Sequence, residues 1–329
     1  MAANGYEWGN VPLGANGFIT GIVIHPTEPD LIYCRTDVGG CYSFDVDSST
    51  WYQLNDSFGL DWQSFYQIDG IALDANNPDI IYIAAGGPAS WDMSDILKSE
   101  DRGKSWKRLN FKGGVFSGNG SYRGWGECIA VDPVNSNIVY CGTYNTGLWR
   151  SANGGSTWEQ VYNTSNPVRS VVFDKKDGRN VIYTSGYNEY LRYSDDGGVT
   201  WKQNTDVPQS IKRMSVDSKG TLYMAGYNSL SKLENGVVSD ISPQQTNGWY
   251  NDVTVSPVDD NYIICLGPHT NENFMSIPFW ESTDGGKTWT NKNSTRRVTS
   301  TLRWDSATDS LKDITSNAHR MLIDPLKPE

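Results

Sequence analysis

The sequence predicts an all-β fold, a seven-bladed β-propeller, and the first reason is a pattern that recurs along the chain. The pattern is a run of alternating hydrophobic residues that ends in Asp or a substitute for it. Its seven copies begin at Gly21, Gly70, Cys128, Ser170, Arg213, Asp252 and Arg320. The six intervals between residues 21 and 320 span 299 residues, or about 50 each, which is the length of a propeller blade. We therefore expect residues 1–329 to form one propeller whose blades start near these positions.

The second reason is that the pattern is followed by a polar turn and another apolar run containing Tyr. Examples are DLIYC, which ends at Cys34, and NIVYC, which ends at Cys141. Two β-rich runs joined by a short Asn/Asp/Pro turn predict a β-hairpin. These hairpins supply strands a and b of each blade.

The third reason is the Asp box, S-x-D-x-G-x-[ST]-W, which occurs at 99–106, 194–201 and 282–289. A fourth copy at 151–158 has Asn153 in the Asp position, the first repeat has a degraded version ending at Trp51, and the fifth repeat has lost it. The Asp accepts backbone N–H bonds in a turn, Gly supplies positive φ, and Trp packs between blades. We therefore expect structural turns between strands c and d, and no catalysis by these aspartates.

The N-terminal segment 6–11 is expected to complete the last blade. Its Trp-x-x-Val spacing matches that of Trp158 and Val161, which belong to an outer strand d. The last blade begins at Arg320, and only strand a fits before Glu329. The seventh blade is therefore expected to be incomplete in this chain, with the remainder supplied by a longer protein or by a second chain.

Composition and charge limit the partners. The net charge is −11, and such a surface repels phosphate backbones and anionic lipid, so we expect neither nucleic-acid nor membrane binding. Neutral polymers remain possible, and the 13 Trp and 18 Tyr suit both β-turn packing and sugar stacking. The first residues, Met1 to Asn4, lack the features of a signal peptide, which leaves a cytoplasmic protein or a mature secreted chain with an added Met.

The cysteines and histidines indicate no disulfide framework, metal or cofactor. Five cysteines cannot all pair, and three of them recur at one repeat position in different blades: Cys34, Cys141 and Cys265. We expect buried free thiols. The histidines are expected at turn-like or surface positions and lack metal-ligand spacing: His25, His269 and His319.

The long insertions fall on one face of the predicted propeller. The a–b and c–d turns share the opposite face, whereas the insertions are d–a loops (52–69, 107–127 and 290–319) or b–c loops (86–95 and 267–280). They carry the tryptophans Trp62, Trp91, Trp125, Trp280 and Trp304. Binding residues commonly lie on such loops, so we expect the functional site on this face.

A ring of equivalent positions lies at the inner rim of this face, three residues beyond each counterpart of Cys34. Its members are Asp37, Tyr144, Tyr187, Tyr227 and Pro268. Tyrosines around one carboxylate suit a carbohydrate cleft, because rings stack on sugar C–H faces and the acid transfers protons. The alternative is that the tyrosines cap the channel and that Asp37 stabilises the turn before Gly39 and Gly40. The residues alone do not decide between these two interpretations.

The run Arg35-Thr36-Asp37-Val38-Gly39-Gly40, preceded by GFITGIVIHPTEPDLIYC, resembles the opening of glycoside hydrolase family 74. The segments ILKSEDRGKSW, GWGECIAVDP and GLWRSANGGSTW fit the same family in order. The resemblance covers essentially the whole chain but only the N-terminal half of the family. It implies two propellers facing each other across a cleft, and a second propeller that this chain does not contain.

The resemblance also implies an activity and a site. Family members cleave the β-1,4-glucan backbone of xyloglucan with inversion, using two aspartates, and Asp37 matches the general base; the acid belongs to the second propeller. It implies a secreted protein, with xyloglucan or a related β-glucan and the complementary propeller as partners. The candidate substrate-binding residues are Trp62, Trp91, Trp125, Tyr144, Tyr187, Tyr227, Trp249 and Tyr250.

Two departures from the family and two other functions bear on these expectations. Cys41 replaces an expected Ala, and residues 269–278 have no Trp where aromatic platforms are expected, which puts distal subsites and processivity in doubt. A sialidase would need an Arg-Ile-Pro signature near the start, which is missing. A non-catalytic carbohydrate-binding or assembly-type Asp-box propeller is the alternative from another functional class.

Overall fold

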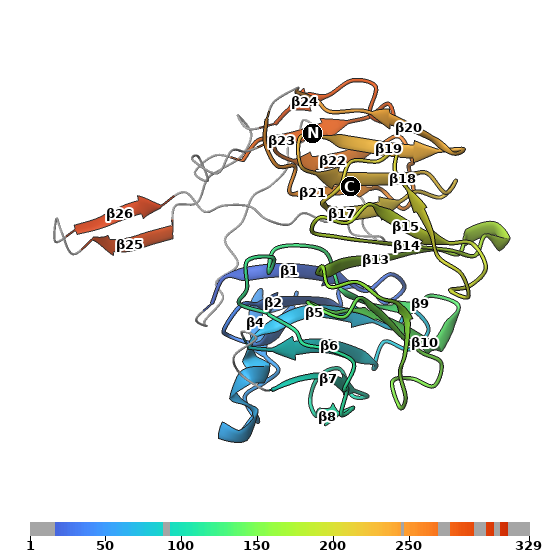
Figure 1. The fold of residues 1–329 in the computed structure, drawn as a ribbon. Helices are drawn as coiled ribbons and strands as arrows, with labels where there is room; N and C mark the ends of the chain where they lie inside the picture. Colours follow the sequence, from blue (N-terminus) through green and yellow to red (C-terminus); the bar gives the residue numbers. More distant parts are fainter. Residues whose placement is uncertain are drawn as a thin grey trace.

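The alternating apolar runs fold into antiparallel four-stranded sheets, which are the blades of a β-propeller (Figure 1). The computed structural model describes residues 17–87, 93–244, 247–268 and 277–292, and the backbone of 301–305 and 310–314. In every blade the strands are hydrogen-bonded in chain order, so that consecutive hairpins build the sheet. Short two-residue outer strands occur in blades 2 and 6.

The blades are numbered along the chain, and their strands are as follows. Blade 1 contains β1 (Ile19–Ile24), β2 (Ile32–Thr36), β3 (Cys41–Asp45) and β4 (Thr50–Gln53). Blade 2 contains β5 (Ile68–Leu73), β6 (Ile81–Gly86), β7 (Ser94–Ser99) and β8 (Lys107–Arg108). Blade 3 contains β9 (Ile129–Asp132), β10 (Asn135–Gly142), β11 (Leu148–Ser151) and β12 (Glu159–Tyr162).

The second half of the chain forms three further blades in the same way. Blade 4 contains β13 (Val168–Asp174), β14 (Val181–Gly186), β15 (Leu191–Ser194) and β16 (Lys202–Asn204). Blade 5 contains β17 (Ile211–Val216), β18 (Leu222–Gly226), β19 (Leu230–Glu234) and β20 (Val237–Asp240). Blade 6 contains β21 (Asp252–Val255), β22 (Ile263–Leu266), β23 (Phe279–Ser282) and β24 (Thr290–Asn291). Two 3₁₀ helices, η1 (Leu60–Tyr66) and η2 (Lys176–Gly178), lie between strands.

The core consists of apolar layers between neighbouring blades. The cluster between blades 2 and 3, for example, joins Tyr82 and Ile96 to Ile129 and Val139, with Trp158 packed against it. The innermost strands of consecutive blades contact one another, as β13 does with β17 and β17 with β21. All five cysteines are buried and free, which confirms the prediction of buried thiols.

The Asp-box hairpins share one hydrogen-bond arrangement. In blade 4, Asp196 Oδ1 accepts the backbone N–H groups of Val199 and Thr200, and Thr200 Oγ1 donates to Asp196 Oδ2 at 2.6 Å. In blade 3, Asn153 replaces the Asp, and its Nδ2 donates to Thr157 Oγ1 at 2.8 Å. The motif thus closes the c–d turn. In blade 2 the motif tryptophan also reaches the neighbouring blade, because Trp106 Nε1 donates to the carbonyl oxygen of Leu54, directly after β4 of blade 1.

The described residues form six blades, so the prediction of seven is not met by them. Segment 6–11 and residues from Arg320 onward, which were expected to form the seventh, lie outside the described residues. The expected loop 290–319 is also corrected: it contains β25 (Thr301–Asp305) and β26 (Ser310–Ile314), a two-stranded hairpin that lies apart from the blades in Figure 1. The alternation of TLRWD and SLKDI is typical of such a hairpin. No helix among the described residues is long and apolar enough to cross a membrane.

Candidate functional site

Asp37 follows directly after β2, in the turn that leads to β3. The turn is closed by its neighbour: Thr36 Oγ1 accepts the N–H of Gly39 at 2.8 Å and donates to Gly40 O at 3.0 Å. Gly40 has φ of 87°, a conformation that favours glycine. The carboxylate of Asp37 instead accepts the N–H of Phe18 at 2.8 Å, outside the turn.

The equivalent turn in blade 3 shows that this turn does not require a carboxylate. Thr143 Oγ1 accepts the N–H of Thr146 and donates to Gly147 O, as Thr36 does in blade 1. Tyr144 occupies the position of Asp37 there, so the same turn closes with a phenol in place of the acid. Closure of this turn therefore does not require a carboxylate at the position of Asp37.

The carboxylate of Asp37 is mostly buried, with its side chain 11% exposed. Its Oδ2 lies 3.4 Å from Nε of Arg123, whose side chain is 39% exposed. The carboxylate is thus largely withdrawn from solvent, beside a cation that solvent reaches.

The predicted rim tyrosines meet in one aromatic cluster. Tyr122 stacks on Tyr187 with centroids 4.7 Å apart and lies 6.1 Å from Tyr144. Trp125 contacts Tyr187 and Trp249, and Trp249 lies 4.9 Å from Tyr227. Blades 3, 4 and 5 therefore contribute to a continuous aromatic surface. Pro268, the ring member of blade 6, is buried.

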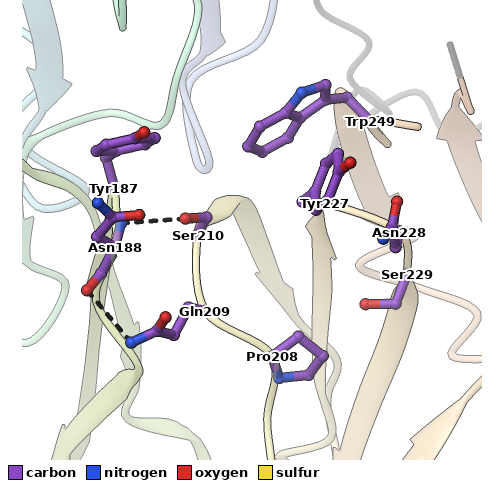
Figure 2. Close-up of a pocket in the computed structure, with 9 residues that line it drawn as sticks. All are labelled: Tyr187, Asn188, Pro208, Gln209, Ser210, Tyr227, Asn228, Ser229 and Trp249. Atoms are coloured by element: carbon purple, nitrogen blue, oxygen red, sulfur yellow. Dashed lines mark hydrogen bonds between the residues drawn. The ribbon is translucent and has the colours of Figure 1, made fainter. Parts of the chain in front are cut away.

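A pocket of about 530 Å³ opens in this surface between blades 4 and 5. Figure 2 shows Tyr187 on one side and Tyr227 with Trp249 on the other, with Ser210 between them. Polar groups complete the lining: Asn188, Gln209, Asn228 and Ser229, together with Pro208. The pocket combines aromatic faces with uncharged donors and acceptors, a composition that suits a neutral, hydroxyl-rich ligand.

Part of the pocket lining is held in an uncommon backbone conformation. Asn188, Ser210 and Asn228 have φ of 55°, 66° and 61°. Asn accepts this left-handed region, whereas for Ser it costs free energy. Hydrogen bonds fix the conformation: Asn188 N donates to Ser210 Oγ at 3.0 Å, and Gly248 N donates to Asn228 Oδ1 at 3.0 Å. The pocket wall is therefore preformed.

Lys212 lies beneath the aromatic cluster. Its Nζ lies 4.5 Å from the ring centroid of Trp249 and 6.0 Å from that of Trp125, and it donates to Asn251 Oδ1 at 2.7 Å. Burial lowers the pKa of Lys212 to about 7, and the charge of Arg213 acts in the same direction. The ammonium is thus partly deprotonated near neutral pH.

Ion pairs cross the central channel below the rim. Four β-bulges place one extra residue of β1, β5, β13 and β17 out of register: Thr20, Asp69, Arg169 and Lys212. Such a bulge redirects a side chain, here toward the channel. Arg169 pairs with Asp69, and both side chains are at most 1% exposed. Glu127, two residues before β9, pairs with Arg35 of blade 1 and Arg213 of blade 5.

Four of the eight predicted substrate-binding residues are partly exposed at the aromatic surface: Tyr144, Tyr187, Tyr227 and Trp249. Trp125 belongs to the cluster but is only 5% exposed, so it supports the other rings from below. Tyr250 is a correction: it is fully buried in the core and donates to Gln244 O, so it offers no exposed face for binding.

Of the other two predicted tryptophans, Trp62 is not brought to the rim. Trp62 lies on η1 in a separate depression of about 440 Å³, beside Phe58 and Trp106. Trp91 lies outside the described residues. Trp280, from the same set of loops, is half-buried and donates to Gly267 O at 2.8 Å.

His25 lies at the turn after β1, as expected, and is completely buried there. Its Nδ1 accepts N–H groups of Thr27 and Glu28, and burial lowers its pKa. His269 and His319 lie outside the described residues. Within the part of the chain that is described, no three His, Cys, Asp or Glu side chains gather as metal ligands.

Sequence reasoning missed Tyr122, Arg123 and the channel residues. Tyr122 and Arg123 belong to the expected loop 107–127, in which only Trp125 was predicted to bind substrate. The channel residues had a clear signal: each directly precedes a copy of the repeat pattern, and all are polar (Thr20, Asp69, Glu127, Arg169, Lys212 and Asn251).

Comparison with known proteins shows which family the chain resembles. Xyloglucanase Xgh74A of Acetivibrio thermocellus is 44% identical over 169 residues, which are 49% of this chain and 20% of that protein. The chain resembles the xyloglucanases of glycoside hydrolase family 74. The predicted resemblance is thereby confirmed.

Solved family 74 structures extend the likeness over most of the chain. The Niastella koreensis enzyme is 33% identical with a TM-score of 0.75, covering 86% of this chain and 46% of its own. The Xanthomonas campestris xyloglucanase is 28% identical with a TM-score of 0.77, at 87% and 46% coverage. The chain thus spans about half of these family 74 structures and about a fifth of the curated Acetivibrio relative. The family described as sortilin, neurotensin receptor 3, matches residues 94–239.

Proposed function

We propose that this chain is the general-base half of an inverting glycoside hydrolase that cleaves the β-1,4-glucan backbone of xyloglucan. The observation that carries the proposal is the position of Asp37, a carboxylate among rim positions that are otherwise occupied largely by tyrosine. Its side chain is 11% exposed and is held by groups outside its own turn. The named activity of the family 74 relatives supports the reaction class.

The aromatic surface is proposed as the glucan-binding site. Tyr187, Tyr227 and Trp249 offer partly exposed rings, and the pocket between them adds neutral hydrogen-bonding groups. Sugar rings stack their C–H faces on such side chains while their hydroxyls bind amides and hydroxyls. The net charge of −11 does not oppose a neutral polysaccharide.

The general acid is assigned to a second propeller that faces this one across a cleft. In an inverting enzyme the two carboxyl groups lie roughly 6.5–9.5 Å apart, which leaves room for the attacking water. In this scheme Asp37 accepts a proton from that water as its oxygen bonds to the anomeric carbon, and the acid protonates the departing sugar oxygen. The limited coverage of the relatives supports a missing second half.

Two further parts of the proposal concern the whole protein. A seventh blade is assigned to segment 6–11 and residues from Arg320 onward, completed by strands from the second half or another chain. Secretion is proposed because xyloglucan is an extracellular polymer.

The test is reducing-end release from xyloglucan by this chain, with binding measured on the same samples. Asp37→Ala removes the proposed base, and Asp206→Ala, an exposed aspartate before β17, is the matched control. We expect all three proteins to bind xyloglucan and none of them to hydrolyse it alone. Once a second propeller is supplied, the wild type and Asp206→Ala should hydrolyse it and Asp37→Ala should not. Hydrolysis by this chain alone that survives in Asp37→Ala contradicts the assignment of the base. Failure of all three to bind contradicts the carbohydrate function and favours a structural propeller.

A further inference from the structure

Arg123 belongs to a segment, Gly118 to Glu127, that is fixed across the mouth of the channel. Arg35 donates to the carbonyl oxygens of Arg123 at 2.9 Å, Trp125 at 3.1 Å and Gly126 at 2.9 Å. At Gly126 the backbone packs so closely that an added Cβ would lie 2.1 Å from Arg169 O. The buried channel residues therefore determine where the backbone of Arg123 lies.

The guanidinium of Arg123 is directed at Asp37. Its Nε lies 3.4 Å from Asp37 Oδ2, and its Nη1 donates to Gly120 O at 3.3 Å. The guanidinium carbon also lies 5.8 Å from the centroid of Phe18, the residue whose N–H binds the other oxygen of Asp37. Arg123 and Phe18 thus hold the carboxylate from two sides.

These two contacts define the plane of the carboxylate. A carboxylate with only the Phe18 N–H bond at Oδ1 could rotate about its last torsion, because that torsion is broad. The Arg123 charge at 3.4 Å from Oδ2 favours one orientation of the carboxylate by electrostatic attraction, without a hydrogen bond from Nε. A carboxylate has about four lone-pair sites, so further sites remain for a proton from water.

Exposure separates Arg123 from the structural arginines of the channel. The side chains of Arg35, Arg169 and Arg213 are at most 2% exposed, whereas that of Arg123 is 39% exposed. The three buried arginines brace the channel, and Arg123 faces the site.

We propose that Arg123 is the positioning residue of Asp37: it fixes the carboxylate plane so that a free lone pair of Asp37 faces the attacking water. This inference rests on the proposed function, in which that water is deprotonated as it attacks. The contact joins residues that are 86 positions apart, and the channel arginine Arg35 maintains it.

The experiment compares Arg123→Met, Arg123→Lys and a control, Arg150→Met. The control breaks the Arg150–Glu159 ion pair on β11, an arginine that is 22% exposed and belongs to no part of the site. Crystal structures of all four proteins give the orientation of the Asp37 carboxylate. Rates of xyloglucan hydrolysis are measured in the presence of the complementary propeller, and thermal unfolding verifies folding.

We expect Arg123→Met to unfold at nearly the wild-type temperature. Its crystal structure should show the Asp37 carboxylate rotated or in more than one conformer. The variant should lower kcat about 10–100-fold and change KM less than about twofold. Arg123→Lys, which keeps a cation, should recover part of kcat, and the control should match wild type. An Asp37 carboxylate in unchanged orientation in Arg123→Met overturns the inference even if no protein hydrolyses xyloglucan. Absence of hydrolysis by the wild type, with the carboxylate displaced in Arg123→Met, counts against the proposed function and supports the positioning role.

Discussion

Replacing Asp69 with Asn removes one charge from an ion pair that solvent does not reach. Asp69 and Arg169 lie on β5 and β13, with side chains 0% and 1% exposed, and Arg169 Nη1 donates to Asp69 Oδ2 at 2.6 Å. Burial by itself raises the pKa of Asp69, but Arg169 and the N–H of Ser117 more than offset this, so its pKa is lowered. The substitution leaves the Arg169 charge buried with its main partner neutralised.

The expected cost follows from that unpaired charge. Removing one member of a buried pair typically destabilises by about 3–5 kcal/mol, whereas replacing both members with apolar side chains is often nearly neutral. We therefore expect Asp69→Asn to lose about 3–5 kcal/mol and the double variant Asp69→Leu/Arg169→Met to lose clearly less. Breaking the exposed Arg150–Glu159 pair with Glu159→Gln should cost about 0–1 kcal/mol.

Urea denaturation followed by tryptophan fluorescence measures these differences in the free energy of unfolding. The pH dependence gives a second test, because the pKa of Asp69 is lower in the folded state than in the unfolded state. Its stabilisation is present above the unfolded pKa of about 3.9 and is lost as the pH falls through the folded pKa. Asp69→Asn should therefore lose less stability on acidification than wild type. A single variant that costs under about 1 kcal/mol, or no more than the double variant, refutes this reasoning.

Three other outcomes test other parts of the molecule. Trp249→Ala should weaken xyloglucan binding about 5–30-fold in calorimetry, about 1–2 kcal/mol, because it removes one wall of the pocket; unchanged affinity excludes the pocket from the binding site. In the wild type, the free energy of unfolding should rise between about pH 7 and pH 10 by at most ~1.4 kcal/mol per pH unit, because in that range Lys212 is protonated in the unfolded chain and not in the folded chain. Lys212→Met should abolish this rise; the same rise in the variant would mean that another group causes it. Asp196→Asn should keep the blade 4 hairpin protected from hydrogen exchange, as Asn153 does in blade 3, whereas Asp196→Ala should expose the Thr200 amide; equal exchange in both variants would contradict this.

The repeats and the rim could be predicted from the sequence because each depends on local periodicity. Strand alternation marked the innermost strands, and the offset from Cys34 found Asp37 and the tyrosines. The same strand periodicity predicts that Tyr250 is not a substrate-binding residue. Adjacent residues in an extended segment point to opposite sides, so Trp249 at the pocket and Tyr250 in the core are complementary positions.

Contacts across the channel could not be predicted in the same way. The position before each pattern copy identifies Asp69 and Arg169 as members of one ring, but their pairing depends on the curvature of the assembled blades. The Arg123–Asp37 contact likewise joins a loop of irregular backbone to a turn in another blade. That loop contains no repeat, so the spacing of residues in the sequence did not predict which of its side chains reach the rim.

The channel pairs connect blades that are not neighbours in the chain: blade 2 with blade 4, and blade 3 with blades 1 and 5. Contacts between adjacent blades tolerate a range of angles between their sheets, whereas an ion pair between non-adjacent blades fixes the distance between those blades. The spacing between Asp37 and the tyrosines of blades 4 and 5 is therefore set from within, by side chains that are largely buried. Substitutions in the channel should consequently alter the fit of a rigid glucan more than that of a flexible one. A screen that varied only ligand-contacting residues would miss the positions that set the width of the cleft.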